Sequence, residues 1–167
     1  FEKFNEKAIK AVMMAQEEAR RLGHNYVGSE MLLVGVMAEN TGVAAKVLKK
    51  LGVTLKDTRK AVEEILGRGD GEVSVEIPFT PSAKRVLGDA VEEARLMNNN
   101  GIDTAHILLA LVKEPDSEGS KVLAKLDVDA TKVAPEIKKE MAEKDEREMV
   151  SVTQKGGNQS QGKGTML

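Results

Sequence analysis

The segment of the sequence closest to a reactive motif lies near its C-terminal end. Residues Gly157–Lys163 follow the spacing of a phosphate-binding P-loop, whose backbone amides and lysine hold the phosphates. A working P-loop also needs Ser or Thr after the lysine to bind Mg²⁺, and a following helix whose N-terminus faces the phosphate. Here Gly164 follows Lys163, and the sequence stops at Leu167. We therefore interpret this stretch as part of a polar linker and not as a nucleotide site.

Other residues that could do chemistry are few. His24 and His106 are the only histidines, and they lack the spacing of a metal-binding pair, whereas a catalytic zinc site usually takes three protein ligands. His106 adjoins apolar residues at a helix start and is expected to be structural or exposed. The acid pairs Glu17–Glu18 and Glu92–Glu93 point in different directions on a helix, so we interpret them as solvated faces. The sequence thus predicts no catalytic residue, no metal and no cofactor.

Two further features have a simple and a functional interpretation. Arg68-Gly69-Asp70 matches an adhesion tripeptide, but a chain with no cysteine and no visible secretion signal favours an ordinary flexible turn. Methionine is an adaptable apolar side chain. Met31 is therefore expected in the core, with a place in a peptide groove beside Glu30 as the alternative.

The composition excludes several classes of function. The 167 residues carry a net charge of −2 and only 2% aromatic residues, so the chain lacks both the basic stripe and the stacking platform of nucleic-acid-binding proteins. The absence of cysteine excludes disulfides and thiolate metal sites. No apolar run approaches the roughly 20 residues that span a bilayer, so we expect no membrane insertion. Hydrophobic residues at 41% are enough for one compact domain.

The main organising feature is an internal repeat. An offset of 75 residues aligns residues 4–66 with 79–141 without a gap, and about fifteen of the aligned positions are identical. The run Glu17–Arg20 aligns with Glu92–Arg95, and Lys46–Leu48 aligns with Lys121–Leu123. Two unrelated amphipathic helices are the alternative, but they would not keep one offset over this length.

Each repeat is expected to form four helices. In the first repeat apolar residues recur at helical spacing from Ala8 to Leu22, and helices also fit residues 29–36, 43–51 and 54–66. The second repeat follows the same plan, with its last helix ending near Met149. Residues able to cap these helices are Asn5, Ser29, Thr54, Thr80, Thr104, Asp116 and Asp129.

The predicted fold class is therefore all-α, with two pseudo-symmetric four-helix repeats packed as one globular domain and a flexible C-terminal tail. We assign residues 1–66 to repeat 1, 67–78 to an inter-repeat linker that is extended over 73–77, 79–148 to repeat 2, and 149–167 to a tail. The tail is rich in Gly, Gln, Ser and Lys and has little to bury.

Several segments of the sequence resemble the double Clp N-terminal domain. They are Phe4–Ala8, Ala15–Glu30 and Gly42–Leu48, and Val75–Leu87 is similar to the opening of the second repeat in ClpC proteins of cyanobacteria and plastids. The resemblance covers about residues 1–143. It implies a domain that captures protein substrates and adaptor proteins for a hexameric ATP-driven AAA+ ring, which passes them to a Clp peptidase core. The nucleotide sites of that ring lie in other domains, so this segment is not an enzyme.

The resemblance also implies candidate binding residues. Some bacterial members bind phosphorylated arginine, with phosphate at a capped helix start and guanidinium on a carboxylate. Matched position by position, repeat 1 offers Asn5 as the helix cap and Glu30 as the carboxylate. Repeat 2 offers Thr80 as the cap, but its carboxylate position is Ala105, and a methyl group cannot pair with a guanidinium. Asn5 departs from the threonine of the family pattern, and Glu30 has an alternative role as a first-turn acid favoured by the helix dipole.

A second surface of the family is a groove between the repeats. The residues that match it are Phe1, Phe79 and Lys84, whereas Phe4 is expected to pack inward. The expected location is the chloroplast stroma, with the bacterial cytoplasm as the alternative. A second function also stays open, that of a stand-alone ClpT-like accessory subunit that binds and stabilises the plastid Clp peptidase core. The altered residues Asp103–His106 of the second repeat favour this alternative.

Overall fold

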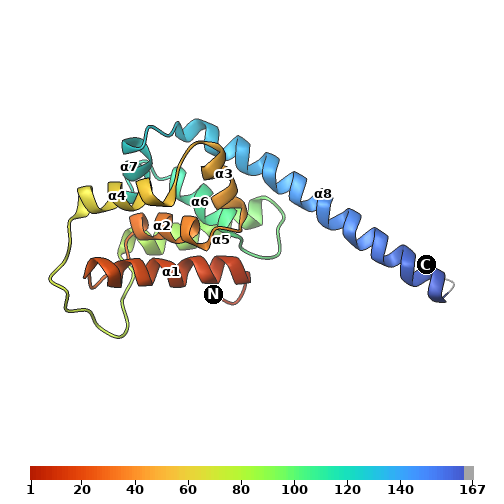
Figure 1. Ribbon diagram of the computed structural model, residues 1–167, viewed down its shortest axis with the longest axis horizontal. Coiled ribbons are helices and arrows are strands. Elements are labelled where there is room, and N and C mark those ends of the chain that lie inside the picture. The colour runs from red at the N-terminus through yellow and green to blue at the C-terminus, as the bar shows by residue number, and fades with distance from the viewer. Residues whose placement is uncertain (164–167) are drawn as a thin grey trace. The chain divides into compact units, whose positions relative to one another are not determined.

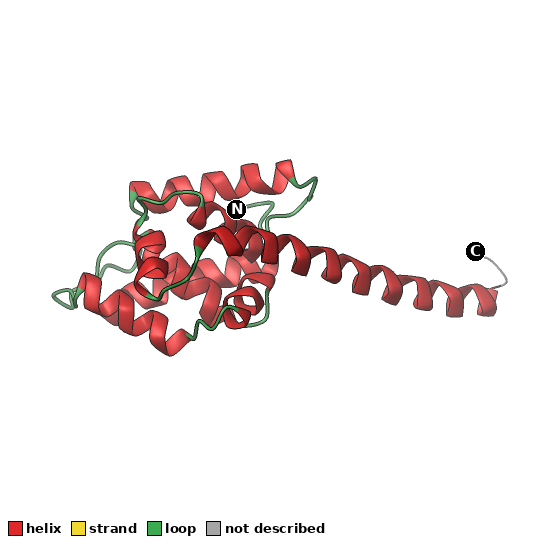
Figure 2. Ribbon diagram, turned by 90° about the horizontal axis from the view of Figure 1, so that it is seen from above, coloured by secondary structure: helices red, strands yellow, loops and turns green. Residues whose placement is uncertain are grey.

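The computed structural model describes the backbone of residues 1–163 and the side chains of residues 1–151. This part of the chain contains eight α-helices joined by loops and no β-strand (Figures 1 and 2). The helices are α1 Glu6–Leu22, α2 Ser29–Glu39, α3 Val43–Lys50, α4 Leu55–Leu66, α5 Pro81–Leu96, α6 Thr104–Val112, α7 Glu118–Lys125 and α8 Ala130–Lys163. The predicted all-α class is confirmed.

The internal repeat is visible in the helix boundaries. The starts of α5, α6, α7 and α8 each lie 75 residues after those of α1, α2, α3 and α4. Left-handed backbone positions repeat at the same offset: Gly23 corresponds to Asn98, and Gly52 corresponds to Asp127. Asn and Asp tolerate this conformation better than other side chains, which explains how the second repeat keeps the turns without the glycines.

The two repeats are joined by backbone hydrogen bonds between their loops. The segment before α1 pairs with the segment before α6: the Asn5 N–H donates to the Ile102 carbonyl at 2.9 Å, and the Ile102 N–H donates to Lys3 at 2.8 Å. The equivalent exchange joins the segments before α5 and α2. There the Thr80 N–H donates to Val27 at 2.9 Å, and the Val27 N–H donates to Pro78 at 2.8 Å. Each repeat therefore places the start of its first helix against the second helix of the other repeat.

The core lies around α2 and α6, whose side chains are almost all buried. α1 packs along α2, and the two ribbons run side by side in Figure 1. Gly35 of α2 lies so close to α1 that a Cβ atom there would stand 2.2 Å from the Ala11 carbonyl oxygen. Met31 is fully buried and Phe4 is 9% exposed, so both belong to the core, and the alternative of Met31 in a groove is wrong.

Three predicted helix caps lie one residue away from the true cap. Asn5, Thr54 and Thr80 cap α1, α4 and α5 as expected, each accepting a backbone N–H three residues later. By contrast, the caps of α2, α6 and α7 are Gly28, Asp103 and Ser117, and not Ser29, Thr104 and Asp116. Asp129 precedes α8 and accepts the Thr131 N–H at 3.0 Å.

Ser29 and Thr104 instead bond to the opposite repeat. The Ser29 hydroxyl accepts the Gly119 N–H at 3.0 Å in the first turn of α7. The Thr104 hydroxyl accepts the Ala44 N–H at 3.3 Å in the first turn of α3. Both hydroxyls are buried, so the donors that they satisfy have no access to water.

We expect Ser29→Ala and Thr104→Ala each to lower the free energy of unfolding by about 1 kcal/mol, because each leaves one helix N–H without an acceptor. Urea denaturation of the single and double variants measures this. Thr131→Ala, at the exposed start of α8, serves as a control and should change stability much less. Equal losses in all three variants would contradict the role of the cross-repeat bonds.

The chain divides into two compact units, residues 1–137 and 138–167. The helix α8 was expected to end near Met149, but it continues to Lys163, because an existing helix gains one hydrogen bond for each residue that joins it. The backbone of residues 157–163 is helical and does not form the loop of a phosphate-binding motif, whereas Gly164 lies outside the described residues. The assignment of residues 149–167 to a tail stays a prediction.

The segment between the repeats forms a loop that is fastened to α1. The Gly69 N–H donates to the Leu22 carbonyl at 2.7 Å, and Arg68 forms an ion pair with Glu63 at 2.9 Å. The arginine of the tripeptide is therefore engaged within the fold, as expected for an ordinary turn. Among the described residues, no single helix is long and apolar enough to cross a membrane; only the sharply bent pair of α2 and α3 has the length and composition.

Candidate functional site

The starts of α2 and α5 lie side by side and form the centre of the candidate site. The backbone pairing of Thr80 with Val27 brings the two helix starts together, and the Ser82 hydroxyl lies 3.4 Å from the Ser29 hydroxyl. Thr80 and Glu30, which come from different repeats, therefore belong to the same region. The Thr80 hydroxyl also accepts the Ala83 N–H at 3.1 Å, so it is fixed at the helix start.

This arrangement corrects the pairing expected from the sequence, which matched residues within one repeat. Asn5 pairs through its backbone with Ile102 and stands beside the start of α6, not beside Glu30. Its side chain accepts the Ala8 N–H at 2.8 Å. The reason for the correction is the exchange of helix starts across the pseudo-two-fold axis, which an offset along the sequence does not reveal.

Glu30 is a buried carboxyl with an unsatisfied oxygen. Its residue is 3% exposed, and its Oε1 atom has no hydrogen-bond partner. The pKa of Glu30 is raised from its ordinary value of 4.5 to about 7, mainly by burial and in addition by the Glu118 carboxylate, while the backbone N–H groups of Glu30 and Met31 act in the opposite direction. A cationic group placed here would give the free Oε1 atom a hydrogen-bond partner and would stabilise the charged form of the carboxyl, which burial disfavours.

Two residues near Glu30 were missed by sequence reasoning. Glu118 lies in the first turn of α7, whose start is bonded to Ser29. Burial raises the pKa of Tyr26, and the carboxyls of Glu30 and Glu118 also raise it. Glu118 aligns with Val43 in the first repeat, so the repeat gave no signal for it; it is found only from the packing of α7 on α2.

The second repeat places its carboxylate differently. Gly28 leaves the space that the Glu30 carboxyl occupies, since a Cβ at Gly28 would stand 1.8 Å from Oε1 of Glu30. In repeat 2 the aligned residues are Asp103 and Ala105, and the Asp103 carboxylate accepts the Ala105 N–H at 3.3 Å. A carboxylate thus stands at the start of α6 although Ala105 has none, but Asp103 is 4% exposed and also accepts the Thr104 hydroxyl at 3.0 Å.

The three phenylalanines of the chain gather at the junction of the repeats. The ring of Phe1 lies 5.1 Å from that of Phe4 and 6.3 Å from that of Phe79. Phe1 is 63% exposed and Phe79 is half-buried, so both offer apolar surface beside the start of α5. Lys84 is exposed one turn further along α5. Phe1, Phe79 and Thr80 therefore lie together at the start of α5, with Lys84 one turn further along the helix.

The acid pairs are not simply solvated. Glu18 is 2% exposed and forms ion pairs with Arg21 and Arg59, and Glu93 is 8% exposed and forms one with Lys113. The expectation of solvated faces holds only for the neighbours at 17 and 92, because adjacent residues on a helix differ by about 100° in direction. Arg59 lies in α4 and Lys113 caps the C-terminus of α6, so the buried acids tie these helices to α1 and α5.

His106 has a structural role. It is fully buried, its Nδ1 accepts the Asp103 N–H at 2.8 Å, and its Nε2 lies 2.9 Å from the Asn99 side-chain oxygen. His24 Nε2 lies 2.8 Å from the Gly67 carbonyl, so it too bonds within the fold. In the part of the chain that the structure describes, His, Asp and Glu side chains form no cluster of three that could hold a metal ion. The candidate site offers a buried carboxyl with an unpaired oxygen and exposed apolar surface, which suit binding.

A family model and several proteins of known sequence match this chain. The model described as "Clp repeat (R) N-terminal domain" matches residues 3–126 and again 79–161. A "ClpA homolog" ATP-binding subunit of an ATP-dependent Clp protease from Guillardia theta is 58% identical over 137 residues, or 82% of this chain. "Chaperone protein ClpC1, chloroplastic" from Arabidopsis thaliana is 50% identical over 160 residues, or 96% of this chain. The chain spans only 17% of the length of each relative.

Solved structures of the same fold include the N-terminal domain of the caseinolytic protease associated chaperone ClpD from Arabidopsis thaliana. It has a TM-score of 0.71 and 31% identity, and the match covers 84% of this chain and 99% of that domain. The ClpV N-domain in complex with a VipB peptide has a TM-score of 0.63 and 17% identity, with coverage of 77% and 81%, and supports the fold alone.

Proposed function

Because the chain belongs to the family of Clp N-terminal repeat domains, we propose that it captures substrate and adaptor proteins for a ClpC-type AAA+ unfoldase. The observation that carries this proposal is the 50% identity to a ClpC1 chaperone over 96% of this chain, which corresponds to 17% of that chaperone. In this proposal a hexameric ring and a Clp peptidase core act on what the domain captures, and the domain itself does no chemistry.

The geometry of the candidate site supports a binding role. Phe1 and Phe79 supply exposed apolar surface, and Lys84 adds a positive charge beside them. The ClpV N-domain, which has the same fold, has been solved with a bound VipB peptide, and by analogy we propose that this chain also captures peptides. The names of the relatives from Arabidopsis and Brassica contain "chloroplastic", so we propose the plastid, and within it the stroma, as the location.

We further propose that one phosphoarginine side chain binds between the starts of α5 and α2. The phosphate would lie at the N-terminus of α5, where Thr80 caps the helix, and the guanidinium would pair with Glu30. The unsatisfied Glu30 oxygen supports this orientation, and Glu118 would add a second negative charge on the guanidinium side. The equivalent site at the starts of α1 and α6 is weaker in this proposal, because the Asp103 carboxylate already has partners.

Calorimetric titration of the chain with free phosphoarginine tests this site. Glu30→Ala is expected to weaken binding by about 100-fold, because it removes a charge-assisted hydrogen bond worth about 2–3 kcal/mol. Asn5→Ala, checked for folding by circular dichroism, should leave the affinity unchanged. Equal losses of affinity in both variants would support the pairing of Asn5 with Glu30 within repeat 1 instead. If the unmodified chain did not bind phosphoarginine at all, the site would be refuted, but adaptor capture would not.

Adaptor capture is tested by a pull-down from plastid extract with the immobilised chain. Recovery of an adaptor that is lost with Phe79→Ser and Lys84→Glu, with retained folding, supports the unfoldase domain. Recovery of the peptidase core in place of an adaptor would support the second candidate, a ClpT-like accessory subunit. The altered residues Asp103–His106 favour that candidate less than the sequence alone suggested, since Asp103 restores a carboxylate at the start of α6.

A further inference from the structure

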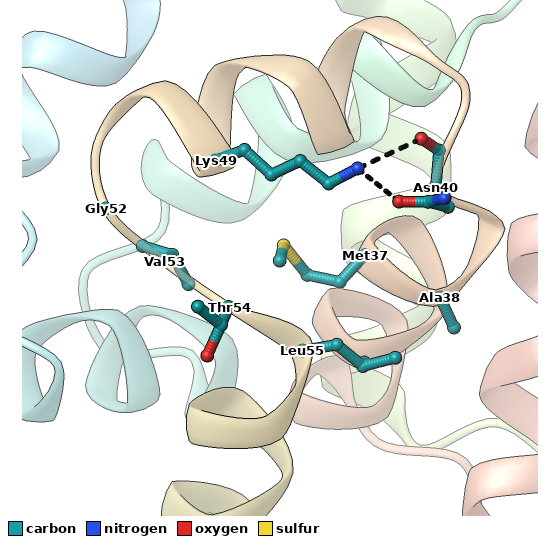
Figure 3. A pocket seen from close by; sticks show the side chains of 8 residues that line it. All are labelled: Met37, Ala38, Asn40, Lys49, Gly52, Val53, Thr54 and Leu55. Carbon is teal, nitrogen blue, oxygen red and sulfur yellow. Dashed lines mark hydrogen bonds between the residues drawn. The ribbon is translucent and has the colours of Figure 1, made fainter.

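A pocket at the other end of α2 is separate from the candidate site. It measures about 600 Å³ and lies between the end of α2, the end of α3 and the start of α4. Because Met37 and Ala38 follow Glu30 by seven and eight residues and a helix rises about 1.5 Å per residue, this pocket lies roughly 10–12 Å along α2 from Glu30. Its lining residues are Met37, Ala38, Asn40, Lys49, Gly52, Val53, Thr54 and Leu55 (Figure 3).

The interior of the pocket is apolar and its rim is positive. The side chains of Met37, Val53 and Leu55 line it below the Lys49 side chain, which crosses the upper edge in Figure 3. The Lys49 ammonium donates to the backbone carbonyl and the side-chain oxygen of Asn40. These acceptors are neutral, and in the described part of the chain Lys49 forms no ion pair, so its charge is available to a partner.

More lysines surround this end of the domain. Lys46 precedes Lys49 by one turn on α3, and Lys56 follows Leu55 at the start of α4; both are exposed. Lys50 is paired with Glu136 at 3.4 Å. Repeat 1 therefore presents an apolar pocket with Lys49 at its edge and two further exposed lysines on the adjoining helices, beside one exposed acid, Asp57.

The second repeat lacks this combination. The 75-residue offset replaces Lys49 by Ala124, Gly52 by Asp127 and Thr54 by Asp129. One positive charge is lost and two negative charges are added at equivalent positions, although the helices there have the same boundaries. The Lys49 charge and the absence of acids at these lining positions are thus properties of repeat 1 and are not required by the fold, whereas Lys46 and Lys50 have counterparts in Lys121 and Lys125.

We propose that this pocket, the α2–α4 pocket, binds a short acidic segment of a partner protein. One leucine-sized side chain of the segment enters between Met37, Val53 and Leu55, and a neighbouring carboxylate pairs with Lys49. The volume suits a few side chains, and an apolar interior with one convergent charge is the usual composition of a binding pocket. The positive rim selects an acidic segment over a basic one by charge complementarity. This surface goes beyond the proposed function, which uses the opposite end of α2.

The probe is an acetylated and amidated peptide of sequence Asp-Glu-Leu-Leu-Glu-Asp, titrated into the labelled full chain and followed by NMR chemical shifts. We expect saturable shifts at Met37, Val53 and Leu55 with a dissociation constant below about 1 mM. Peptides with lysine in place of the acids, or serine in place of the leucines, should bind about tenfold more weakly or not at all.

The matched variant carries the lining of repeat 2 in repeat 1: Lys49→Ala, Gly52→Asp and Thr54→Asp. It is expected to fold, because Asp127 adopts a positive φ where Gly52 does, and Asp129 caps a helix where Thr54 does. Its affinity for the acidic peptide should fall by about tenfold or more. Lys125→Ala, which removes an exposed lysine from α7, should bind as the unmodified chain does.

Four outcomes would overturn the proposal. The first two are the absence of saturable binding and an unchanged affinity in the triple variant. The third is equal binding of decanoate, which would make the pocket a site for any anionic amphiphile. The fourth is chemical shifts that depend on protein concentration alone, which would assign the pocket to a second copy of this chain. Phosphoarginine titration of the triple variant separates the two sites, because its binding between α5 and α2 should persist.

Discussion

Replacing Gly35 by alanine is expected to lower the free energy of unfolding by about 3 kcal/mol. Helix propensity alone predicts the opposite sign, since alanine stabilises a helix interior by about 1 kcal/mol relative to glycine. Packing decides the result. A Cβ atom at this position would stand 2.2 Å from the Ala11 carbonyl oxygen and 3.1 Å from the Ala15 backbone nitrogen, so α1 and α2 would have to move apart. Backbone atoms cannot move aside as a flexible side chain can.

Urea denaturation followed by far-ultraviolet circular dichroism measures the effect. The matched control is Ala110→Gly, because Ala110 of α6 is the aligned residue in repeat 2 and is fully buried. At that position the structure already accommodates a methyl group. The substitution should lower the free energy of unfolding by roughly 1 kcal/mol through the lower helix propensity of glycine, and the cavity left by the methyl group should lower it further. If Gly35→Ala were as stable as the unmodified chain, α1 and α2 would not approach as closely as the structure describes.

The aligned positions Gly35 and Ala110 show how much of the fold follows from the sequence. The constant offset was enough to predict four helices in each repeat and the correspondence of their boundaries, because periodicity and turn residues act locally. It did not predict that Gly35 and Ala110 would differ in their packing. The separation of two helices depends on all the side chains between them, and no window of sequence contains that information.

The helix starts show the same limit. Asn5, Thr54 and Thr80 were predicted correctly as caps because a cap bonds to its own helix, three residues away. Ser29 and Thr104 were assigned to the same role but bond across the repeats. The backbone pairing likewise brings Thr80, and not Asn5, beside the start of α2. The sequence offered candidate binding residues one at a time, whereas the proximity of Thr80 to the start of α2, which carries Glu30, became visible only in three dimensions.

Stability of the chain is expected to fall by about 3 kcal/mol between pH 4.5 and pH 7 through Glu30 alone. The pKa of this carboxyl rises from its ordinary value of 4.5 to about 7 in the folded state, first because burial disfavours the charge and then because the Glu118 carboxylate lies near. The folded state therefore binds the proton more tightly than the unfolded state. Its contribution is greatest below pH 4.5 and is lost as the pH rises to about 7.

The substitution Glu30→Gln isolates this contribution, because other titrating groups are common to both proteins and cancel in the difference. We expect the stability of the variant to increase relative to that of the unmodified chain as the pH rises from 5 to 8. The difference between their free energies of unfolding should change by about 3 kcal/mol over this range. At pH 5 the variant should be no more stable, since glutamine replaces a carboxyl that is already mostly protonated. Urea denaturation at a series of pH values provides the measurement.

Glu118→Gln separates the two causes of the raised pKa. Removing the Glu118 charge should lower the pKa of Glu30 but leave it above 4.5, because burial is the larger cause. The pH-dependent loss of stability should then become smaller without disappearing. A Glu30→Gln difference that stays constant across this pH range would show that Glu30 ionises normally and that water or a cation already satisfies its Oε1 atom. Such a result would leave a carboxylate that is already charged at neutral pH, so a bound guanidinium would no longer be needed to stabilise its charge.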